Sequence, residues 1–165
     1  MNKAVFLDRD GVINFEKGHY TTNLDDFIIN KGVGAAIKLL KDNGYLVIVI
    51  SNQGGIAKAL YTHEDVLEMH IKFCEYLFEF DTKIDDFFYC PHHQDYGKCL
   101  CRKPEALLFE KAIKIYNIDV KNSLMIGDSD RDIQAAAKCG INGIKIKPNE
   151  NILEICKQIV GGVYG

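Results

Sequence analysis

Short apolar runs alternate with longer amphipathic segments along the chain. Four of the runs are rich in β-branched or aromatic residues, and their apolar positions are continuous, which is typical of strands covered on both faces. They predict strands at residues 3–7, 45–50, 86–90 and 123–127, with a fifth at 143–147.

The segments between these runs have apolar residues at helical spacing. They predict helices over residues 34–44, 62–80, 104–116 and 130–140. Thr62 and Asp65 are spaced as a capping pair, and Pro104 occupies a place that suits the first residue of a helix. Strands alternating with helices predict a Rossmann-like, three-layer α/β sandwich with a mainly parallel sheet. Ligands of such folds bind at the carboxyl ends of the strands.

The length and composition indicate one globular domain. A chain of 165 residues is too short for two ordinary domains, so residues 1–165 are predicted to form a single one. A net charge of -3 offers no basic excess for a polyanion, which disfavours a nucleic-acid partner. No apolar run has the length of a membrane span, and the first ten residues do not fit a secretory leader. We therefore expect a cytoplasmic monomer with no membrane partner.

In a reducing compartment, the three cysteines inside apolar helical patterns are expected to be buried thiols: Cys74, Cys139 and Cys156.

Polar residues follow the first two predicted strands. Asp8 and Asp10 lie two apart after the first strand, so an extended backbone turns both side chains to the same side. This pair alone is also common in solvated turns. Ser51 and Asn52 end the second strand, where a hydroxyl, an amide and glycine N–H groups suit an oxyanion.

The fourth predicted strand ends in Asp128, with Asp132 one helical turn later on the same face. Carboxylates that meet at one sheet edge repel one another unless a cation lies among them, and such oxygen ligands suit magnesium. Asp8 can then attack phosphorus and form an aspartyl-phosphate, while Asp10 exchanges protons with the leaving group and with water. Lys103 fits the fixed cation that phosphoryl transfer requires, although a lysine alone is more often a solvated surface residue.

These motifs together resemble the four motifs of the haloacid dehalogenase-like phosphatases in order and spacing. The matching elements are Asp8-x-Asp10, Ser51, Lys103 and Gly127-Asp128-x-x-x-Asp132. The segments DRDG, NQGGIA, CPHH, CRKP and GDSDRDIQAA are similar to the subgroup of heptose-bisphosphate and histidinol-phosphate phosphatases, over residues 3 to 146.

The resemblance implies a magnesium-dependent phosphomonoesterase. Asp8 is the implied nucleophile and Asp10 the general acid and base, and the magnesium ligands are Asp8, the carbonyl of Asp10, and Asp128. Four residues are expected to bind the phosphate or the rest of the substrate: Ser51, Asn52, Arg102 and Lys103.

Cysteines and histidines crowd residues 90–105. Four of them fit a closed, tetrahedral zinc site of the Cys3His type: Cys90, His92, Cys99 and Cys101. A disulfide is disfavoured by the compartment and the spacing, and a redox pair by the lack of a C-x-x-C motif. The resemblance likewise implies a structural zinc ion at these positions, with His92 preferred to His93. Because Cys101 directly precedes Arg102 and Lys103, this zinc-binding loop is expected to position both cations.

The implied substrate is a small phosphorylated sugar of lipopolysaccharide-precursor metabolism. The expected reaction removes the 7-phosphate of D-glycero-D-manno-heptose 1,7-bisphosphate. The alternatives are histidinol phosphate and, more remotely, a nucleic-acid 3′ end; a phosphomutase and a non-enzymatic zinc module are disfavoured.

No segment is long enough for a large cap domain, so loops must determine specificity. His19 and Tyr20 either contact the sugar or are plain loop residues. Ser129 stands where the subgroup commonly has a basic residue, a role for which Arg131 is the candidate replacement.

Overall fold

The computed structural model describes residues 1–164, and Gly165, the last residue of the predicted domain, lies outside them. Strands and helices alternate along the chain as predicted. In chain order they are β1 (Ala4–Leu7), α1 (Val33–Asp42), β2 (Leu46–Asn52), α2 (His63–Phe78), β3 (Asp86–Cys90), α3 (Leu107–Tyr116), β4 (Leu124–Gly127), α4 (Asp130–Lys138), β5 (Asn142–Lys145) and α5 (Leu153–Val160).

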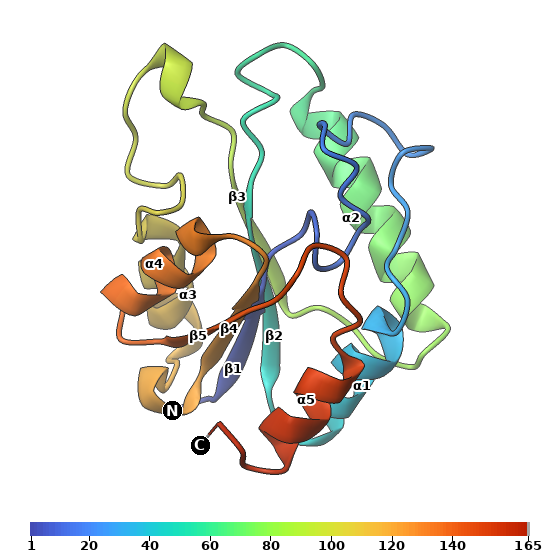
Figure 1. Cartoon of the computed structure of the whole chain (residues 1–165), viewed down its shortest axis with the longest axis vertical. Coiled ribbons are helices and arrows are strands. Elements are labelled where there is room, and N and C mark those ends of the chain that lie inside the picture. Colours follow the sequence, from blue (N-terminus) through green and yellow to red (C-terminus); the bar gives the residue numbers. More distant parts are fainter. Residues whose placement is uncertain (165) are drawn as a thin grey trace.

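The strands form one parallel sheet in the order β3-β2-β1-β4-β5 (Figure 1). Central strand β1 pairs with both neighbours, and Leu7 lies opposite Val49 on one side and Ile126 on the other. Winding reverses at β1, because β2 and β3 follow on one side of it and β4 and β5 on the other. A crevice therefore opens at the carboxyl ends of β1 and β4, where ligands of such folds bind.

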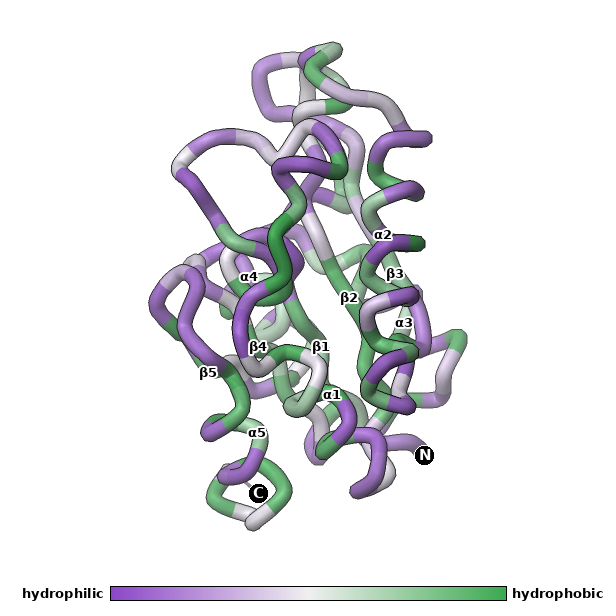
Figure 2. The backbone as a smooth tube through the Cα atoms, turned by 90° about the vertical axis from the view of Figure 1, so that its right-hand side faces the viewer, coloured by the Kyte–Doolittle hydropathy of each residue, from purple (hydrophilic) through white to green (hydrophobic). Residues whose placement is uncertain are grey.

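Helices cover both faces of the sheet, which confirms the three-layer prediction. Helices α1, α2 and α5 lie on one face, and α3 and α4 lie on the other (Figure 1). Strand β1 serves both cores, since Val5 and Leu7 face the first group while Ala4 and Phe6 face the second. Hydrophobic residues run along the strands, whereas the loops beyond their carboxyl ends are mainly hydrophilic (Figure 2). Burial of β1 on both faces explains why its apolar run is continuous.

Two helices differ from the predictions. Helix α3 begins at Leu107 instead of Pro104, because residues 102–105 form a turn in which Glu105 N–H donates to the Arg102 carbonyl at 2.8 Å. Helix α5 was not predicted, although its Cys156 and Ile159 pack into the core at helical spacing. The capping pair Thr62–Asp65 is confirmed as a capping box at the start of α2.

The three cysteines of the helical patterns differ in exposure. Cys156 is buried as expected, and Cys139 is partly buried. The prediction is wrong for Cys74, which is exposed on α2. The apolar pattern of α2 is wider than the face it buries, because Leu67, Ile71 and Phe78 are exposed as well.

Residues 8–32, between β1 and α1, form only isolated bridges, such as those of Asn14 with Asp10 and Ile29, and no cap domain. The loop between β3 and α3 contains a single 3-10 turn, Gln94–Tyr96. Within residues 1–164, no helix combines the length and the apolar character needed to cross a bilayer.

Candidate active site

Asp8 is the first residue after β1 and stands at the crevice between β1 and β4. Its backbone N–H donates to the Ile126 carbonyl at 3.1 Å, which extends the pairing of the two strands by one residue. Its Oδ1 accepts hydrogen bonds from the Arg9 backbone N–H and from Lys103 Nζ, both at 2.8 Å. Strand β4 and the loop that carries Lys103 therefore both contact Asp8.

Lys103 is buried between two carboxylates. Its Nζ lies 2.8 Å from Asp8 Oδ1 and 2.6 Å from Asp132 Oδ1, and it also donates to the Ile50 carbonyl at 2.6 Å. Burial lowers the pKa of Lys103, but the charges of Asp8 and Asp132 outweigh it and raise the pKa above its ordinary value. The side chain is therefore an ammonium ion at neutral pH.

Asn52 holds the backbone from which Lys103 projects. Its Nδ2 donates to the Lys103 carbonyl at 3.0 Å, and its Oδ1 accepts from the Lys103 N–H at 2.9 Å. Both ends of the amide are thus engaged by one residue. A direct contact of Asn52 with phosphate stays a prediction. The two hydrogen bonds to the Lys103 backbone were not predicted.

Asp128 and Asp132 approach the site past two glycines. A Cβ added to Gly11 would lie 2.0 Å from Asp128 Oδ2, and one added to Gly127 would lie 2.3 Å from Asp132 Cβ. Asp132 also closes a capping box at the start of α4, where its Oδ2 accepts from the N–H and hydroxyl of Ser129. Oxygen atoms of Asp8, Asp128 and Asp132 lie within 4.8 Å of one another.

The carboxylates of Asp8, Asp128 and Asp132 can bind a cation in addition to Lys103. Burial raises the pKa of Asp8 to about 7, with Lys103 opposing the rise and Asp132 adding to it. Burial, together with Asp132, also raises the pKa of Asp128 to about 6. Three carboxylates therefore face a single ammonium ion, and their hard oxygen atoms fit a divalent cation such as magnesium.

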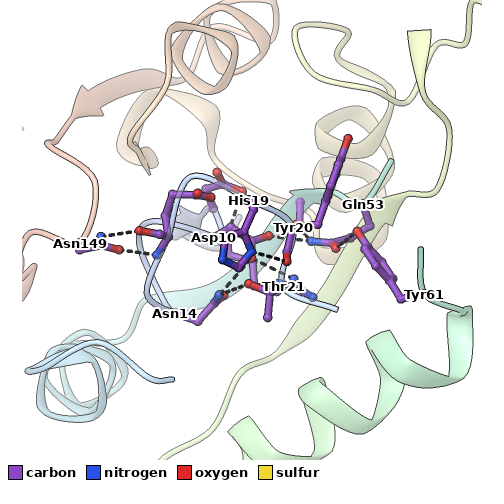
Figure 3. Close-up of polar contacts among 12 residues, drawn as sticks. Asp10, Asn14, His19, Tyr20, Thr21, Gln53, Tyr61 and Asn149 are labelled. Atoms are coloured by element: carbon purple, nitrogen blue, oxygen red, sulfur yellow. Dashed lines mark hydrogen bonds and ion pairs between the residues drawn. The ribbon is translucent and has the colours of Figure 1, made fainter. Parts of the chain in front are cut away.

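Asp10 accepts hydrogen bonds from three side chains, and Figure 3 shows two of them, Asn14 and Gln53. Arg9 Nη2 and Asn14 Nδ2 each donate to Oδ1 at 3.0 Å, and Gln53 Nε2 donates to Oδ2 at 2.9 Å. Burial raises the pKa of Asp10, but the Arg9 charge and these hydrogen bonds bring it below its usual range. Arg9 is buried and its guanidinium lies over the Phe27 ring. The Asp10 carboxylate therefore forms an ion pair with a cation whose position is fixed.

A cleft of about 380 Å³ opens above these groups. Its walls include Asn52, Arg102 and Arg131, and the predicted sugar-contact candidates His19 and Tyr20. Arg102 is held by a hydrogen bond from Nη1 to the His92 carbonyl at 3.2 Å. Ser51 lies deeper and is buried, and its hydroxyl oxygen accepts from Gln53 Nε2.

The predicted zinc ligands come together in the loop after β3. Cys90 Sγ lies 3.0 Å from Cys101 Sγ, 3.7 Å from Cys99 Sγ and 3.5 Å from His92 Nδ1. His93 points elsewhere, since its Nδ1 accepts from the Asp95 N–H. Three thiols and one imidazole are the donor set of a Cys3His zinc site, and their ligand atoms all lie within 4.8 Å of one another.

Several residues of the site have no role predicted from the sequence. Arg9, Asn14 and Gln53 bind Asp10, and Tyr61 binds Gln53 through a hydrogen bond of 2.7 Å. Arg9 and Gln53 adjoin predicted motif residues, which is the one signal that the sequence offered. Tyr61 lies eight residues beyond Gln53 and meets it only through the fold.

Known proteins similar to this chain belong to one family. A HAD-hydrolase-like family model matches residues 100–151, which include Lys103, Asp128 and Asp132. The D-glycero-beta-D-manno-heptose-1,7-bisphosphate 7-phosphatase of Haemophilus ducreyi is 40% identical over 146 residues, which are 84% of this chain and 79% of that protein. The chain belongs to the haloacid dehalogenase-like phosphatase family.

Further relatives confirm the subgroup that the motifs indicate. The D-glycero-alpha-D-manno-heptose-1,7-bisphosphate 7-phosphatase of Campylobacter jejuni is 40% identical and covers 90% of this chain and 83% of its own length. The crystal structure of D,D-heptose 1,7-bisphosphate phosphatase from B. bronchiseptica, complexed with magnesium and phosphate, superimposes with a TM-score of 0.91 at 28% identity. That match covers 97% of this chain and 99% of the other. This phosphatase is accordingly a phosphoric monoester hydrolase.

Proposed function

We propose that this phosphatase removes the 7-phosphate of D-glycero-D-manno-heptose 1,7-bisphosphate, with Asp8 as nucleophile and Asp10 as general acid and base. The observation that supports it best is the buried Lys103 ammonium ion, which contacts both Asp8 and Asp132 at the carboxyl ends of β1 and β4. The heptose-bisphosphate relatives at 40% identity favour this substrate.

In the first step, an Asp8 carboxylate oxygen attacks phosphorus and the bond from phosphorus to the sugar oxygen breaks. Both hydrogen bonds described above fall on Asp8 Oδ1, so we assign the attack to Oδ2. Asp10 gives a proton to the departing sugar oxygen. In the second step, Asp10 takes a proton from water and the water oxygen attacks phosphorus. The bond between phosphorus and Asp8 Oδ2 breaks, which releases inorganic phosphate and returns Asp8 to a free carboxylate.

Asp10 must hold a proton when the substrate is bound, although Arg9 and its hydrogen bonds keep its pKa low in the free protein. An anionic phosphate beside Asp10 favours the protonated form, because like charges disfavour ionisation. Lys103 stabilises the charge on the transferring group, and its own bonds keep it in place before the substrate arrives.

Magnesium would be held by Asp8, Asp128 and the carbonyl of Asp10. When bound, it supplies charge neutralisation for the phosphoryl group and for the nucleophile. Asp132 is engaged by Lys103 and by the turn at Ser129, so we assign it the positioning of Lys103.

A structural zinc ion is proposed at Cys90, His92, Cys99 and Cys101. Gln53 N–H donates to the Cys90 carbonyl at 2.7 Å, and Ala57 N–H to the Pro91 carbonyl at 3.2 Å, so the zinc-binding loop is tied to the loop after β2. The ion would thereby fix the backbone from which Arg102 and Lys103 project.

Phosphate release in the presence of magnesium tests the proposed function. The panel contains both anomers of the heptose bisphosphate, histidinol phosphate and a 3′-phosphorylated oligonucleotide. We expect the highest kcat/KM with a heptose bisphosphate and loss of turnover in Asp8→Asn. A higher kcat/KM with histidinol phosphate or the oligonucleotide would reassign the substrate, and full activity of Asp8→Asn would refute the nucleophile. The cytoplasmic location and the monomeric state belong to the same proposal, and light scattering on the purified protein tests the second.

A further inference from the structure

Gln53 connects Asp10 to a buried tyrosine. Its Nε2 donates to Asp10 Oδ2 at 2.9 Å and to Ser51 Oγ at 2.6 Å, while its Oε1 accepts from the Tyr61 hydroxyl at 2.7 Å. Figure 3 shows the side chains of Tyr61, Gln53 and Asp10 in a row. Gln53 is 1% exposed and Tyr61 is 6% exposed, so water competes little for these bonds.

The tyrosine fixes which end of the amide faces Asp10. A carboxamide has one donor end and one acceptor end. If the Gln53 amide were turned over, its Oε1 would face the Asp10 carboxylate and two acceptors would meet. A hydroxyl that donates to Oε1 favours the observed orientation, and burial raises the pKa of Tyr61 to about 12, so the hydroxyl keeps its proton.

The backbone is shaped to bring Tyr61 back to Gln53. A Cβ added to Gly55 would lie 2.1 Å from Tyr61 Cε1, so the ring occupies space that only glycine leaves free. Leu60 N–H donates to the Gly55 carbonyl at 2.9 Å, and Ala59 has a positive φ of 55°. The segment from Gln53 to Tyr61 therefore closes on itself beside the active site.

The two oxygens of Asp10 are held by different groups. Arg9 and Asn14 donate to Oδ1, whereas within the described chain the donor to Oδ2 is Gln53. Without Gln53 the carboxylate would keep its place near Arg9 but lose the contact that sets its rotation. A general acid must be oriented toward the leaving oxygen, so this rotation affects the rate of proton transfer.

We propose that Gln53 and Tyr61 are positioning residues that orient the Asp10 carboxylate for proton transfer to the leaving group. The inference rests on the proposed function, in which Asp10 is the general acid and base.

The test compares two leaving groups in Gln53→Leu and Tyr61→Phe. One substrate is an alkyl phosphate, namely the sugar phosphate that the wild type hydrolyses best. Its leaving group is an alkoxide, which needs a proton from Asp10 as it departs. The phenolate of p-nitrophenyl phosphate leaves without one. Because kcat/KM reports the steps up to the first phosphoryl transfer, a defect in proton donation lowers it for the alkyl phosphate alone.

For the alkyl phosphate, we expect kcat/KM to fall about 30-fold in Gln53→Leu and about 3-fold in Tyr61→Phe, within the range that general acid catalysis supplies. For p-nitrophenyl phosphate, kcat/KM should be nearly unchanged in both variants, and so should inhibition by inorganic phosphate. Neither the departure of p-nitrophenolate nor the binding of phosphate needs the proton of Asp10. Tyr116→Phe is the matched control, since it also deletes a hydroxyl that donates to a side chain, Asp86 Oδ2 at 2.8 Å, but outside the residues that line the cleft.

Equal losses on both substrates would overturn the proposal, because they would indicate general damage to the site. Wild-type ratios of the two kcat/KM values in both variants would overturn it as well. If Gln53→Leu does not fold, Tyr61→Phe alone decides, since it removes a single oxygen atom. A wild type that hydrolyses neither ester would refute the proposed function itself, whereas an active wild type with unchanged variant ratios refutes only the positioning role.

Discussion

Gly11 lies directly against Asp128. An added Cβ would lie 2.0 Å from Asp128 Oδ2, and the φ of Gly11 is +86°, a conformation that L side chains rarely adopt. The glycine after the first motif therefore makes room for the aspartate of the fourth. The loops that follow β1 and β4 thus approach each other closely at this contact.

Gly11→Ala should displace Asp128 from Asp8 and weaken magnesium binding. We expect the magnesium concentration for half-maximal activity to rise about tenfold or more, as for other changes beside metal ligands. Activity titrated with magnesium measures the effect. Gly162→Ala is the control, because Gly162 has a φ of +80° with nothing within 4 Å of the added Cβ. Magnesium dependence like that of the wild type in Gly11→Ala would contradict the close approach.

Lys103→Met should abolish turnover and destabilise the fold. The substitution leaves Asp8 and Asp132 buried without their common cation, which costs about 3 kcal/mol or more of unfolding free energy at pH 7. Urea unfolding measures it. Lys138→Met removes an ion pair with Glu105 in which both side chains are about half exposed, and should cost less than about 1 kcal/mol.

The double variant Lys103→Met/Asp132→Asn should regain part of the stability but none of the activity, because one of the two unpaired charges is gone. Recovered turnover in this variant would show that the ammonium ion is not required for phosphoryl transfer.

Cys101→Ser should remove zinc and lower stability and turnover together. Elemental analysis of the purified wild type should give one zinc ion per chain, and thermal unfolding and kcat report the consequence of its loss. Cys74→Ser is the control, since Cys74 is exposed on α2 and outside the cluster. Wild-type kinetics in a zinc-free variant would rule out the positioning of Arg102 and Lys103 by the loop.

His70 should make the protein less stable in acid. Burial, with a smaller effect of Arg9, lowers the pKa of His70 to about 3, whereas in an unfolded chain it is about 6.5. Between these values the unfolded chain binds a proton that the folded chain does not, so the unfolding free energy falls as the pH is lowered, by up to about 1.4 kcal/mol per pH unit.

His70→Phe should flatten this dependence, because a phenyl ring can keep the stack on Phe87, 4.2 Å between ring centres, without a titrating nitrogen. Urea unfolding at pH 7, 6 and 5 compares the two proteins. Parallel losses of stability in both would assign the acid sensitivity to other groups.

The sequence predicted local features of the fold best. Strands β1 and β2 are buried on both faces, so their apolar runs were unambiguous, and the prediction for β3 matched its observed range, Asp86–Cys90. The start of α3 was misplaced because residues 102–105 form a turn instead of a helix. Within this turn, Lys103 is hydrogen-bonded to Asn52, which lies 51 residues away in the sequence. A propensity such as that of Pro104 for a first helical turn cannot reveal such a constraint.

The candidate site was predictable to the extent that its residues end strands. Asp8, Asp128 and Lys103 come together as their motifs indicated, and His92 lies with the cysteines. Tyr61 was not predictable, because its partner Gln53 is fixed by a loop closure that depends on Gly55 and on the positive φ of Ala59. The bonds of Asn52 to Lys103 were not predictable either, because they depend on the tertiary fold.

The amide of Asn52 resembles a peptide group, with one donor and one acceptor turned to the backbone of Lys103. The backbone N–H and C=O of Lys103 are thus bonded to the Asn52 side chain in the way that a strand residue is bonded to a neighbouring strand. This clamp holds the Lys103 backbone from the side of β2, at the end of the loop that contains Cys99 and Cys101. We therefore expect the segment between His92 and Cys99 to tolerate changes of length and sequence, because the Lys103 ammonium ion is held from Asn52 and from its own buried contacts.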